Sequence, residues 1–371
     1  MSVPCGTAHD RAAKALQKAI LTLRPNAQVE VIDALAHSTP WFRAYYNSYV
    51  IILKLSPNLW RQIENIQHQS KSTSPGWIYK HGAKPLFRYI RDFAPDLVIA
   101  TEVGACELAA LYKRQAKAKF LLAGVELMDF NHAWIQPEVD LLLATHEDLA
   151  AELVAAGAPA SGVVTTGQPI DPAFASLPER DSAREALGIR PDALQLLVLL
   201  GGTGLEDPDR ILAEVLKIQK QIETVIITGR NQRLEAQLRH KLKGLSHVRV
   251  LGWVDNIQEW MVASDLMVSK PGGGTLTEGF ACGLPMLAFN PLPGNEERTC
   301  RWIEKWGGGI WIRKPRHLAP TIESLIADRS KLNALRDHAR VLARPNSARD
   351  GALAVLELLA KKNAVLGKAG V

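Results

Sequence analysis

Short apolar segments and amphipathic segments follow one another along the chain in two successive series. In the first series, residues 8–23 carry apolar side chains at helical spacing, which predicts a helix, and a second helix is expected at 146–156. Strand-length apolar segments occur at 29–32, 95–100, 119–123, 141–144 and 163–166. Strands that alternate with helices predict a parallel sheet covered on both faces.

The same pattern begins again after the proline-containing segment 168–172. Strands are predicted at 194–200, 224–228, 248–251, 266–269 and 285–289. Helices are expected at 209–221, 232–242 and from 275 to about 282. We therefore expect an α/β protein with two Rossmann-like domains, residues 1–168 and 169–371, and a cleft between them. A helix at about 348–362 is expected to pack back on the first domain.

The first domain begins unusually, because only Met1-Ser-Val-Pro4 precedes its first loop. A Rossmann-like domain normally opens with an apolar central strand, and losing that strand would remove many ladder hydrogen bonds. We expect a first strand that is short or missing, with the natural start of the chain upstream.

The composition is that of a folded protein, because 47% of the 371 residues are apolar and 22% are charged. No apolar stretch approaches the ~18 residues that span a bilayer, and no signal-peptide pattern opens the chain. Four cysteines without metal-ligand spacing fit a reducing cytoplasm. The whole net charge of +6 arises in residues 1–100, where 12 Lys and Arg oppose 6 Asp and Glu. Such a basic region could meet nucleic acid or an anionic membrane.

The most informative segment is Lys270-Pro-Gly-Gly-Gly-Thr-Leu-Thr-Glu278, which follows an expected strand. Its backbone N–H groups can approach an anion because of three successive glycines, Gly272, Gly273 and Gly274. A helix that begins near Thr275 adds partial positive charge, so the segment can hold a diphosphate without a metal. Glu278 could then accept hydrogen bonds from ribose hydroxyls. Thr275 and Glu278 equally fit a helix capping box, which needs no ligand.

Other candidates follow strands of the second domain. The loop 290–297 ends in polar side chains that could face sugar hydroxyls or simply begin a helix, namely Asn295, Glu296 and Glu297. The backbone of Val254 could pair with a planar base. Gly202 and Thr203 lie in a second glycine turn, and Arg230 follows another strand; all three are donor-site candidates.

In the first domain, His9 lies where the first helix opens. A neutral imidazole there could take a proton from an attacking hydroxyl. A histidine at a helix start is also commonly a cap or a solvated side chain, so both interpretations stay open.

Five blocks of the sequence together resemble the glycosyltransferases that make glycolipids from diacylglycerol. These are the monogalactosyldiacylglycerol synthases and the processive diacylglycerol glucosyltransferases of glycosyltransferase family 28. Residues 6–13 resemble the family's G-x-G-H-x-R-A-A loop, and residues 252–274 its G-x-V-D-N-x-x-x-W-M-x-x-x-D block with the K-P-G-G turn. Residues 290–297 resemble its N-P-x-P-G-x-E loop. Residues 37–60, and 129–134 with 167–170, resemble the diacylglycerol-specific segment and the end of the first domain.

The resemblance implies the GT-B arrangement of two Rossmann-like domains, with a UDP-sugar held mainly by the second. It implies that uracil meets Val254, the diphosphate Gly272, Gly273 and Thr275, the ribose Glu278, and the hexose Asn295 and Glu296. His9 would be the base. The family inverts the anomeric centre without a catalytic metal, so no cofactor beyond the UDP-sugar is expected.

The chain departs from the family pattern at three places. Ala8 replaces a usual glycine, and Asn295 stands where many relatives have glutamine. The segment 101–104 lacks the His-Pro typical of the family, which makes Glu102 an alternative base. Acceptor-side candidates in the block that ends the first domain are Asp129, His132 and Trp134.

The diacylglycerol-specific block interleaves aromatic and basic side chains. Its acceptor- and membrane-contact candidates are Trp41, Phe42, Arg43, Tyr45 and Tyr46. Such a segment can place aromatic rings at the headgroup level while its cations meet anionic lipid. The same pattern also occurs in ordinary core helices.

We therefore expect a cytoplasmic, peripheral (monotopic) membrane enzyme that moves glucose or galactose from a UDP-sugar to diacylglycerol with inversion. One alternative is a UDP-N-acetylglucosamine transferase that acts on a polyprenyl-linked or other lipid acceptor. Another is a UDP-sugar-binding regulator without turnover. No nucleic-acid partner is expected, because the sequence contains no recognisable binding module.

Overall fold

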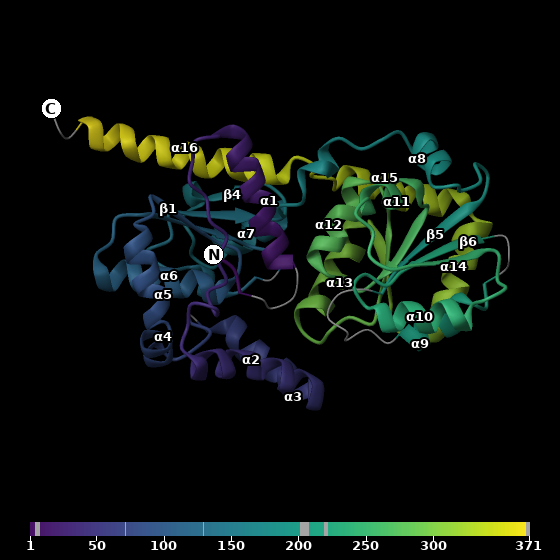
Figure 1. Cartoon of the computed structure of the whole chain (residues 1–371), viewed down its shortest axis with the longest axis horizontal. Helices are drawn as coiled ribbons and strands as arrows, with labels where there is room; N and C mark the ends of the chain where they lie inside the picture. Colours follow the sequence, from purple (N-terminus) through teal and green to yellow (C-terminus); the bar gives the residue numbers. More distant parts are fainter. Residues whose placement is uncertain (4–7, 71, 129, 201–207, 219–221, 369–371) are drawn as a thin grey trace. The chain divides into compact units, whose positions relative to one another are not determined.

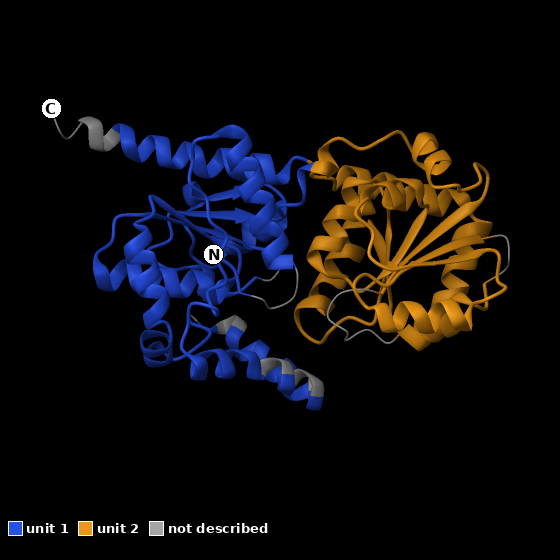
Figure 2. Ribbon diagram, viewed as in Figure 1, with its two compact units in different colours: residues 1–172, 346–371 blue, residues 173–345 orange. Residues whose placement is uncertain are grey.

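A computed structural model describes residues 1–3, 8–70, 72–128, 130–200, 208–218 and 222–368. The chain divides into two compact units, residues 1–172 with 346–371 and residues 173–345 (Figure 2). Each unit contains a parallel sheet flanked by helices (Figure 1), so the predicted α/β class with two Rossmann-like domains is confirmed. The division falls at residue 172 rather than 168, and the C-terminal helix belongs to the first unit.

The sheet of the first unit has the order β1-β2-β3-β4. Its strands are β1 (Leu97–Ala100), β2 (Leu121–Val125), β3 (Leu141–Ala144) and β4 (Val163–Thr165). Residues 1–3 continue the sheet beside β1, because the Met1 amino group donates to the Ile99 carbonyl (2.7 Å) and the Thr101 N–H donates to the Met1 carbonyl (3.0 Å). A single parallel bridge joins Ser2 to Asp33 on the far side. The first strand is thus short. The strand expected at 29–32 is wrong: Ile32 accepts the Ser2 N–H (2.9 Å), but the bridge falls at Asp33 and residues 29–32 form no strand.

Helices cover the first unit. They are α1 (Ala8–Leu23), α2 (Pro40–Leu55), α3 (Pro57–Gln69), α4 (Gly76–Gly82), α5 (Lys84–Phe93), α6 (Val103–Ala116), η1 (His132–Trp134), α7 (Glu147–Ala155), η2 (Ala160–Gly162) and α16 (Ser347–Lys368). In Figure 1, α16 runs beside α1, and Ala352 and Val355 share a buried cluster with Leu16 and Leu143. The C-terminal helix therefore completes the core of the first unit.

The sheet of the second unit has the order β10-β9-β8-β5-β6-β7, all parallel. Its strands are β5 (Leu194–Leu199), β6 (Ile222–Ile227), β7 (Val248–Leu251), β8 (Leu266–Ser269), β9 (Met286–Phe289) and β10 (Gly309–Ile312). The chain moves outward from β5 to β7 and then returns to the other side of β5 through β8. This is the strand order of Rossmann folds, in which ligands bind beyond the carboxyl ends of the strands where the order reverses.

The sequence explains why the central strands of this sheet form. Every residue of β8 and β9 is buried, as expected for strands covered on both faces, which read as continuous apolar runs. The helices around the sheet are α8 (Arg180–Ala186), α9 (Pro208–Val215), α10 (Gln232–Lys241), α11 (Ile257–Ala263), α12 (Gly273–Ala281), α13 (Asn295–Trp306), α14 (Leu318–Ala327) and α15 (Arg329–Val341). Short 3₁₀ turns are η3 (Pro172–Ala175), at the boundary between the units, and η4 (Pro315–His317).

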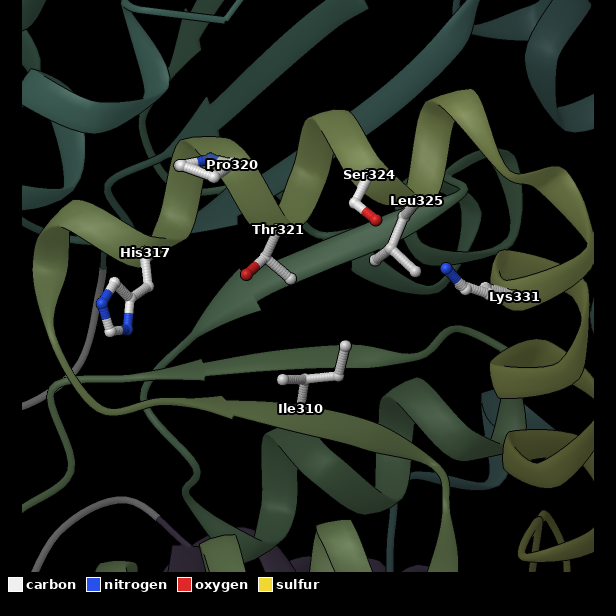
Figure 3. Close-up of a pocket in the computed structure, with 7 residues that line it drawn as sticks. All are labelled: Ile310, His317, Pro320, Thr321, Ser324, Leu325 and Lys331. Carbon is white, nitrogen blue, oxygen red and sulfur yellow. The ribbon is translucent and has the colours of Figure 1, made fainter.

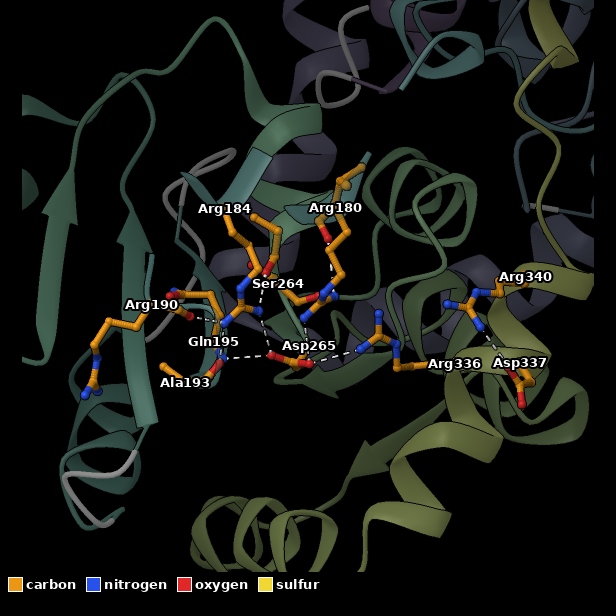
Figure 4. Close-up of polar contacts among 12 residues, drawn as sticks. Arg180, Arg184, Arg190, Ala193, Gln195, Ser264, Asp265, Arg336, Asp337 and Arg340 are labelled. Atoms are coloured by element: carbon orange, nitrogen blue, oxygen red, sulfur yellow. Dashed lines mark hydrogen bonds and ion pairs between the residues drawn. The ribbon is translucent and has the colours of Figure 1, made fainter. Parts of the chain in front are cut away.

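A buried carboxylate joins several elements of the second unit (Figure 4). Asp265, before β8, accepts hydrogen bonds from Arg180 (2.8 Å) and Arg336 (3.0 Å), and from the Gln195 N–H (2.9 Å). Arg184 lies 3.5 Å from the same carboxylate and donates to the Ala263 carbonyl. The negative charge of Asp265 is therefore shared by three positively charged arginines from α8 and α15.

Candidate active site

In the second unit, the glycine-rich turn follows β8, one of the two strands between which the order reverses. Helix α12 begins at Gly273, with Gly272 in extended conformation as its N-cap. The helix therefore starts two residues before the position expected from the sequence. Thr275 lies inside the first turn, so the capping box of Thr275 with Glu278 is wrong. The N–H groups of the first turn of α12 are the ones expected from the sequence to bind an anion, and that expectation is unchanged by the earlier helix start.

Two carboxylates are associated with this turn: one lies on the helix that follows it, and the other pairs with a residue of the turn. Glu278, on α12, is only 3% exposed. Glu296, on α13, pairs with Lys270 (3.2 Å) and accepts the Leu292 N–H (2.6 Å). This pairing connects the turn after β8 to the loop after β9. Lys270 was not a candidate from the sequence, although it opens the glycine-rich segment.

The loop between β9 and α13 holds unusual backbone conformations. Asn290 has φ 49° and Gly294 has φ 91°. Left-handed conformations in residues other than glycine are costly and cluster at functional sites. Glu297 accepts the Gly294 N–H (3.3 Å) in a capping box, so this side chain begins the helix. The sugar contacts of Asn295 and Glu296 stay predictions.

An aromatic side chain lies in the segment after β7. From the sequence, only the backbone of Val254 was a candidate in this segment. Trp253 is 59% exposed, and the Arg230 guanidinium lies 4.5 Å from its ring centroid. The Trp253 indole N–H donates to Asp255 (2.8 Å). The structure thus adds Trp253 to this edge; its only sequence signal was an aromatic residue directly after a strand. Gly202 and Thr203 lie outside the described residues.

In the first unit, the order of strands reverses between residues 1–3 and β1, and the two residues at this point contact each other. His9, in the first turn of α1, places Nδ1 2.5 Å from the Thr101 carbonyl oxygen. The Thr101 hydroxyl donates to the His9 carbonyl (3.0 Å). His9 is half-buried and Thr101 is 1% exposed. A ring held by Nδ1 leaves Nε2 as the nitrogen that can take a proton.

The alternative base, Glu102, has a capping role in the structure. Its carboxylate accepts the Ala105 N–H (2.8 Å) at the start of α6 and the Tyr46 hydroxyl (2.8 Å). The residue is 6% exposed. Because both carboxylate oxygens already accept hydrogen bonds, the geometry favours His9 as the base.

A second buried carboxylate lies on the same helix. Glu107 accepts the Thr73 N–H (3.0 and 3.1 Å) and the hydroxyls of Thr73 and Tyr79. Burial raises the pKa of Glu107 to about 7, and the negative charge of Glu102 adds to the shift. The folded state therefore favours the protonated carboxyl.

This shift predicts a pH-dependent stability. The unfolded pKa of Glu107 is 4.5 and the folded value is about 7, so its contribution is complete below pH 4.5 and is lost as pH rises through 7. The free energy of unfolding of the wild type relative to Glu107→Gln should fall by about 3 kcal/mol between pH 4.5 and 8. Urea unfolding at several pH values measures this difference. A difference that stays constant with pH would contradict the assignment.

In the aromatic segment predicted to contact lipid, the fold leaves some side chains exposed and buries others. Trp41 and Tyr45 are 45% and 40% exposed, whereas Phe42 is fully buried. Tyr46 bonds to Glu102, and the Arg43 guanidinium donates to the Leu35 and Ala36 carbonyls. The expectation that Phe42 reaches a lipid is therefore wrong, because α2 turns this face toward the core.

Further exposed apolar side chains on α2, α3 and α4 were not among the sequence candidates. They are Ile51, Leu55, Leu59, Ile66 and Trp77, and with Trp41 and Tyr45 we refer to these exposed side chains as the α2–α4 apolar surface. Their exposed fractions reach 81% at Leu55 and 65% at Trp77. In Figure 1 these three helices gather at one end of the first unit. Across the described residues, every helix is either too short or too polar to span a bilayer.

The block that ends the first domain lies largely inside the unit. Trp134 is fully buried, which corrects its assignment to an acceptor or membrane contact, while His132 is half-buried with its ring against Phe130 (5.1 Å between centroids). Asp129 lies outside the described residues. Met128, just before it, has φ 69° and is buried.

A cavity of about 400 Å³ lies elsewhere on the second unit, between β10 and α14 (Figure 3). Its apolar floor includes Ile310 and Leu325, and His317 and Lys331 lie at its edges. None of the sequence candidates lines it. Among the described residues, no three His, Cys, Asp or Glu side chains are grouped to hold a metal ion.

Comparison with known proteins shows what the chain is similar to. The family model "Monogalactosyldiacylglycerol (MGDG) synthase" matches residues 9–170, and "Glycosyl transferases group 1" matches residues 198–328. A processive diacylglycerol β-glucosyltransferase of Bacillus licheniformis is 28% identical over 73% of this chain and 70% of its own length. One from Bacillus mycoides is 27% identical over 92% and 89%. The chain is similar to the diacylglycerol glycosyltransferases over most of its length, which agrees with the resemblance seen in the sequence.

The prediction of a UDP-sugar-dependent glycosyltransferase is thereby confirmed at the level of enzyme class. The solved UDP-GlcNAc 2-epimerase of Neisseria meningitidis, bound to UDP-GlcNAc, has a TM-score of 0.62 over 95% of this chain and 96% of its own, at 16% identity. This likeness confirms the GT-B fold of the glycosyltransferase. It does not specify the reaction, since one fold serves different reactions.

Proposed function

We propose that this glycosyltransferase transfers glucose or galactose from a UDP-sugar to diacylglycerol at a membrane surface, with inversion at the anomeric carbon. The observation that carries the proposal is the placement of the candidate residues. The glycine-rich turn follows β8, and His9 and Glu102 follow residues 1–3 and β1, which are strands between which the strand order reverses and where Rossmann-like sheets bind ligands. Other donor candidates follow neighbouring strands of the second sheet, β6, β7 and β9. The acceptor follows from the relatives, which are named as diacylglycerol glucosyltransferases.

The second unit supplies the donor chemistry in this proposal. The diphosphate lies against the N–H groups that open α12, where the helix dipole favours negative charge. Glu278 binds the ribose, Val254 the base, and Asn295 and Glu296 the hexose. As the bond to the sugar breaks, negative charge grows on the diphosphate, and fixed N–H donors stabilise that charge in the transition state. The proposal needs no metal and no further cofactor.

The first unit supplies the base. The Thr101 carbonyl holds the Nδ1 side of the His9 ring, and Nε2 takes the proton from the acceptor hydroxyl. The hydroxyl oxygen attacks the anomeric carbon from the face opposite to UDP, so the configuration inverts in one step.

We also propose that the α2–α4 apolar surface brings the enzyme to the cytoplasmic face of an anionic membrane. Exposed Trp77, Trp41 and Leu55 can enter the headgroup and acyl boundary, where aromatic rings are favoured. The basic excess of residues 1–100 adds attraction to anionic lipid. In this proposal the lipid contacts include side chains of α3 and α4 and no longer include Phe42.

A double substitution tests the membrane proposal. Leu55→Ser with Trp77→Ser should weaken binding to phosphatidylglycerol vesicles at least about tenfold, because each side chain contributes of order 1–3 kcal/mol when buried in lipid. Co-sedimentation with the vesicles measures the binding. Val341→Ser is a matched control, since Val341 is 81% exposed on the other unit. Equal binding of the double variant and the control would refute this surface.

A donor and acceptor screen tests the function. Labelled UDP-glucose, UDP-galactose and UDP-N-acetylglucosamine are each offered with diacylglycerol or with a polyprenyl-linked sugar, and the product configuration is determined. We expect hexose on diacylglycerol with inverted configuration. Transfer only of N-acetylglucosamine, or only to the polyprenyl acceptor, would overturn the proposal.

A further inference from the structure

The His9 imidazole is held from one side by main chain rather than by an acidic side chain. Its Nδ1 lies 2.5 Å from the Thr101 carbonyl oxygen. A carbonyl oxygen can only accept a hydrogen bond, so Nδ1 must carry the proton at this contact. The neutral ring is therefore the Nδ1–H tautomer, and its lone pair lies on Nε2.

Thr101 binds His9 a second time. The Thr101 hydroxyl donates to the His9 carbonyl at 3.0 Å and lies farther, at 3.4 Å, from the Met1 carbonyl. The two residues are thus joined by one bond from the His9 ring to Thr101 main chain and one from the Thr101 side chain to His9 main chain. Together these bonds fix both the backbone and the ring of His9.

Thr101 is itself held firmly. It directly follows β1, its N–H donates to the Met1 carbonyl (3.0 Å), and it is 1% exposed. The carbonyl that orients His9 therefore lies directly after β1, on a residue whose N–H is bonded to Met1. The orientation of the base is set where β1 meets residues 1–3.

We propose that Thr101 is a positioning residue that sets the tautomer and orientation of His9, so that Nε2 faces the acceptor hydroxyl. This inference rests on the proposed function of His9 as the base. Carboxylates commonly orient catalytic histidines. In the structure, Glu102 caps α6 and bonds to Tyr46, and the neutral carbonyl of the preceding residue holds the ring.

The first test needs no variant at Thr101. Nitrogen NMR of the full-length protein with ¹⁵N-labelled histidine distinguishes protonated from unprotonated ring nitrogens, and the signals that vanish in His9→Gln identify His9 among ten histidines. We expect Nδ1 protonated and Nε2 unprotonated when the ring is neutral. The opposite tautomer would overturn the inference, whatever the activity of the enzyme.

The second test uses a substitution of matched shape. Thr101→Val removes the hydroxyl but keeps the volume and the main-chain carbonyl, so the Nδ1–H tautomer should persist. The His9 main chain loses the bond that fixes it, and kcat should fall about three- to tenfold, as for the loss of one net hydrogen bond. The KM for the UDP-sugar should not change, because the donor residues lie in the other unit. Thr101→Ser keeps the hydroxyl and should retain the wild-type kcat.

The outcomes separate this inference from the proposed function. If Thr101→Val leaves kcat unchanged, the Thr101 side chain does not position the base. If His9→Gln retains full activity while the wild type shows the Nδ1–H tautomer, the contact is real but His9 is not the base, and the proposed function fails at this residue.

Discussion

Replacing His9 with glutamine should lower kcat by about 10²- to 10⁴-fold, the range that a general base contributes. The glutamine amide can still donate to the Thr101 carbonyl, but it offers no nitrogen that takes a proton at neutral pH. The binding of UDP should be unchanged, because the residues proposed to hold it lie on the second unit. Initial rates with diacylglycerol and calorimetric titration with UDP measure the two quantities.

A histidine remote from the candidate residues provides the control for this prediction. His317 lines the cavity between β10 and α14, and His317→Gln should leave kcat unchanged. If His9→Gln keeps half or more of the wild-type rate, His9 is not the base. Equal losses in the two variants would instead indicate a general effect of histidine substitution.

Replacing Asp265 with alanine should lower the free energy of unfolding by about 3–5 kcal/mol, the loss expected when a buried ion pair loses one partner. Arg180 and Arg336 donate to this carboxylate, and Arg184 lies against it. Without the carboxylate, their positive charges stay near one another in a largely buried position. Urea unfolding of the full-length protein measures the change.

A second arginine–aspartate pair shows what burial contributes. Arg340 and Asp337 form an ion pair at 2.9 Å with side chains 61% and 68% exposed. Asp337→Ala should change stability by at most about 1 kcal/mol, as for other surface ion pairs. If Asp265→Ala costs no more than Asp337→Ala, the network of Figure 4 does not stabilise the second unit as its burial suggests.

Some functional positions can be read from the sequence because they depend on local chemistry. The segment from Lys270 to Glu278 combines a strand end, three glycines and a helix start, and each of these leaves a local signal. The partners in the first unit leave no such signal. His9 and Thr101 are far apart in the chain and meet only because residues 1–3 and β1 are neighbours in the sheet.

The sequence alone determined the two α/β units, five of the six strands of the second sheet and the glycine-rich turn, because periodicity and turn chemistry act over a few residues. The edge strand β10 was not predicted. Only the tertiary structure decided which side chains of a pattern face the core and which face solvent. Phe42 and Trp41 are adjacent aromatic residues, yet one is fully buried and the other is 45% exposed, since α2 has a single face against the unit. The tertiary structure likewise decided that Glu102 caps a helix while His9 is held by a carbonyl. Those roles depend on which strands and helices pack together, and that packing depends on contacts distant in the chain.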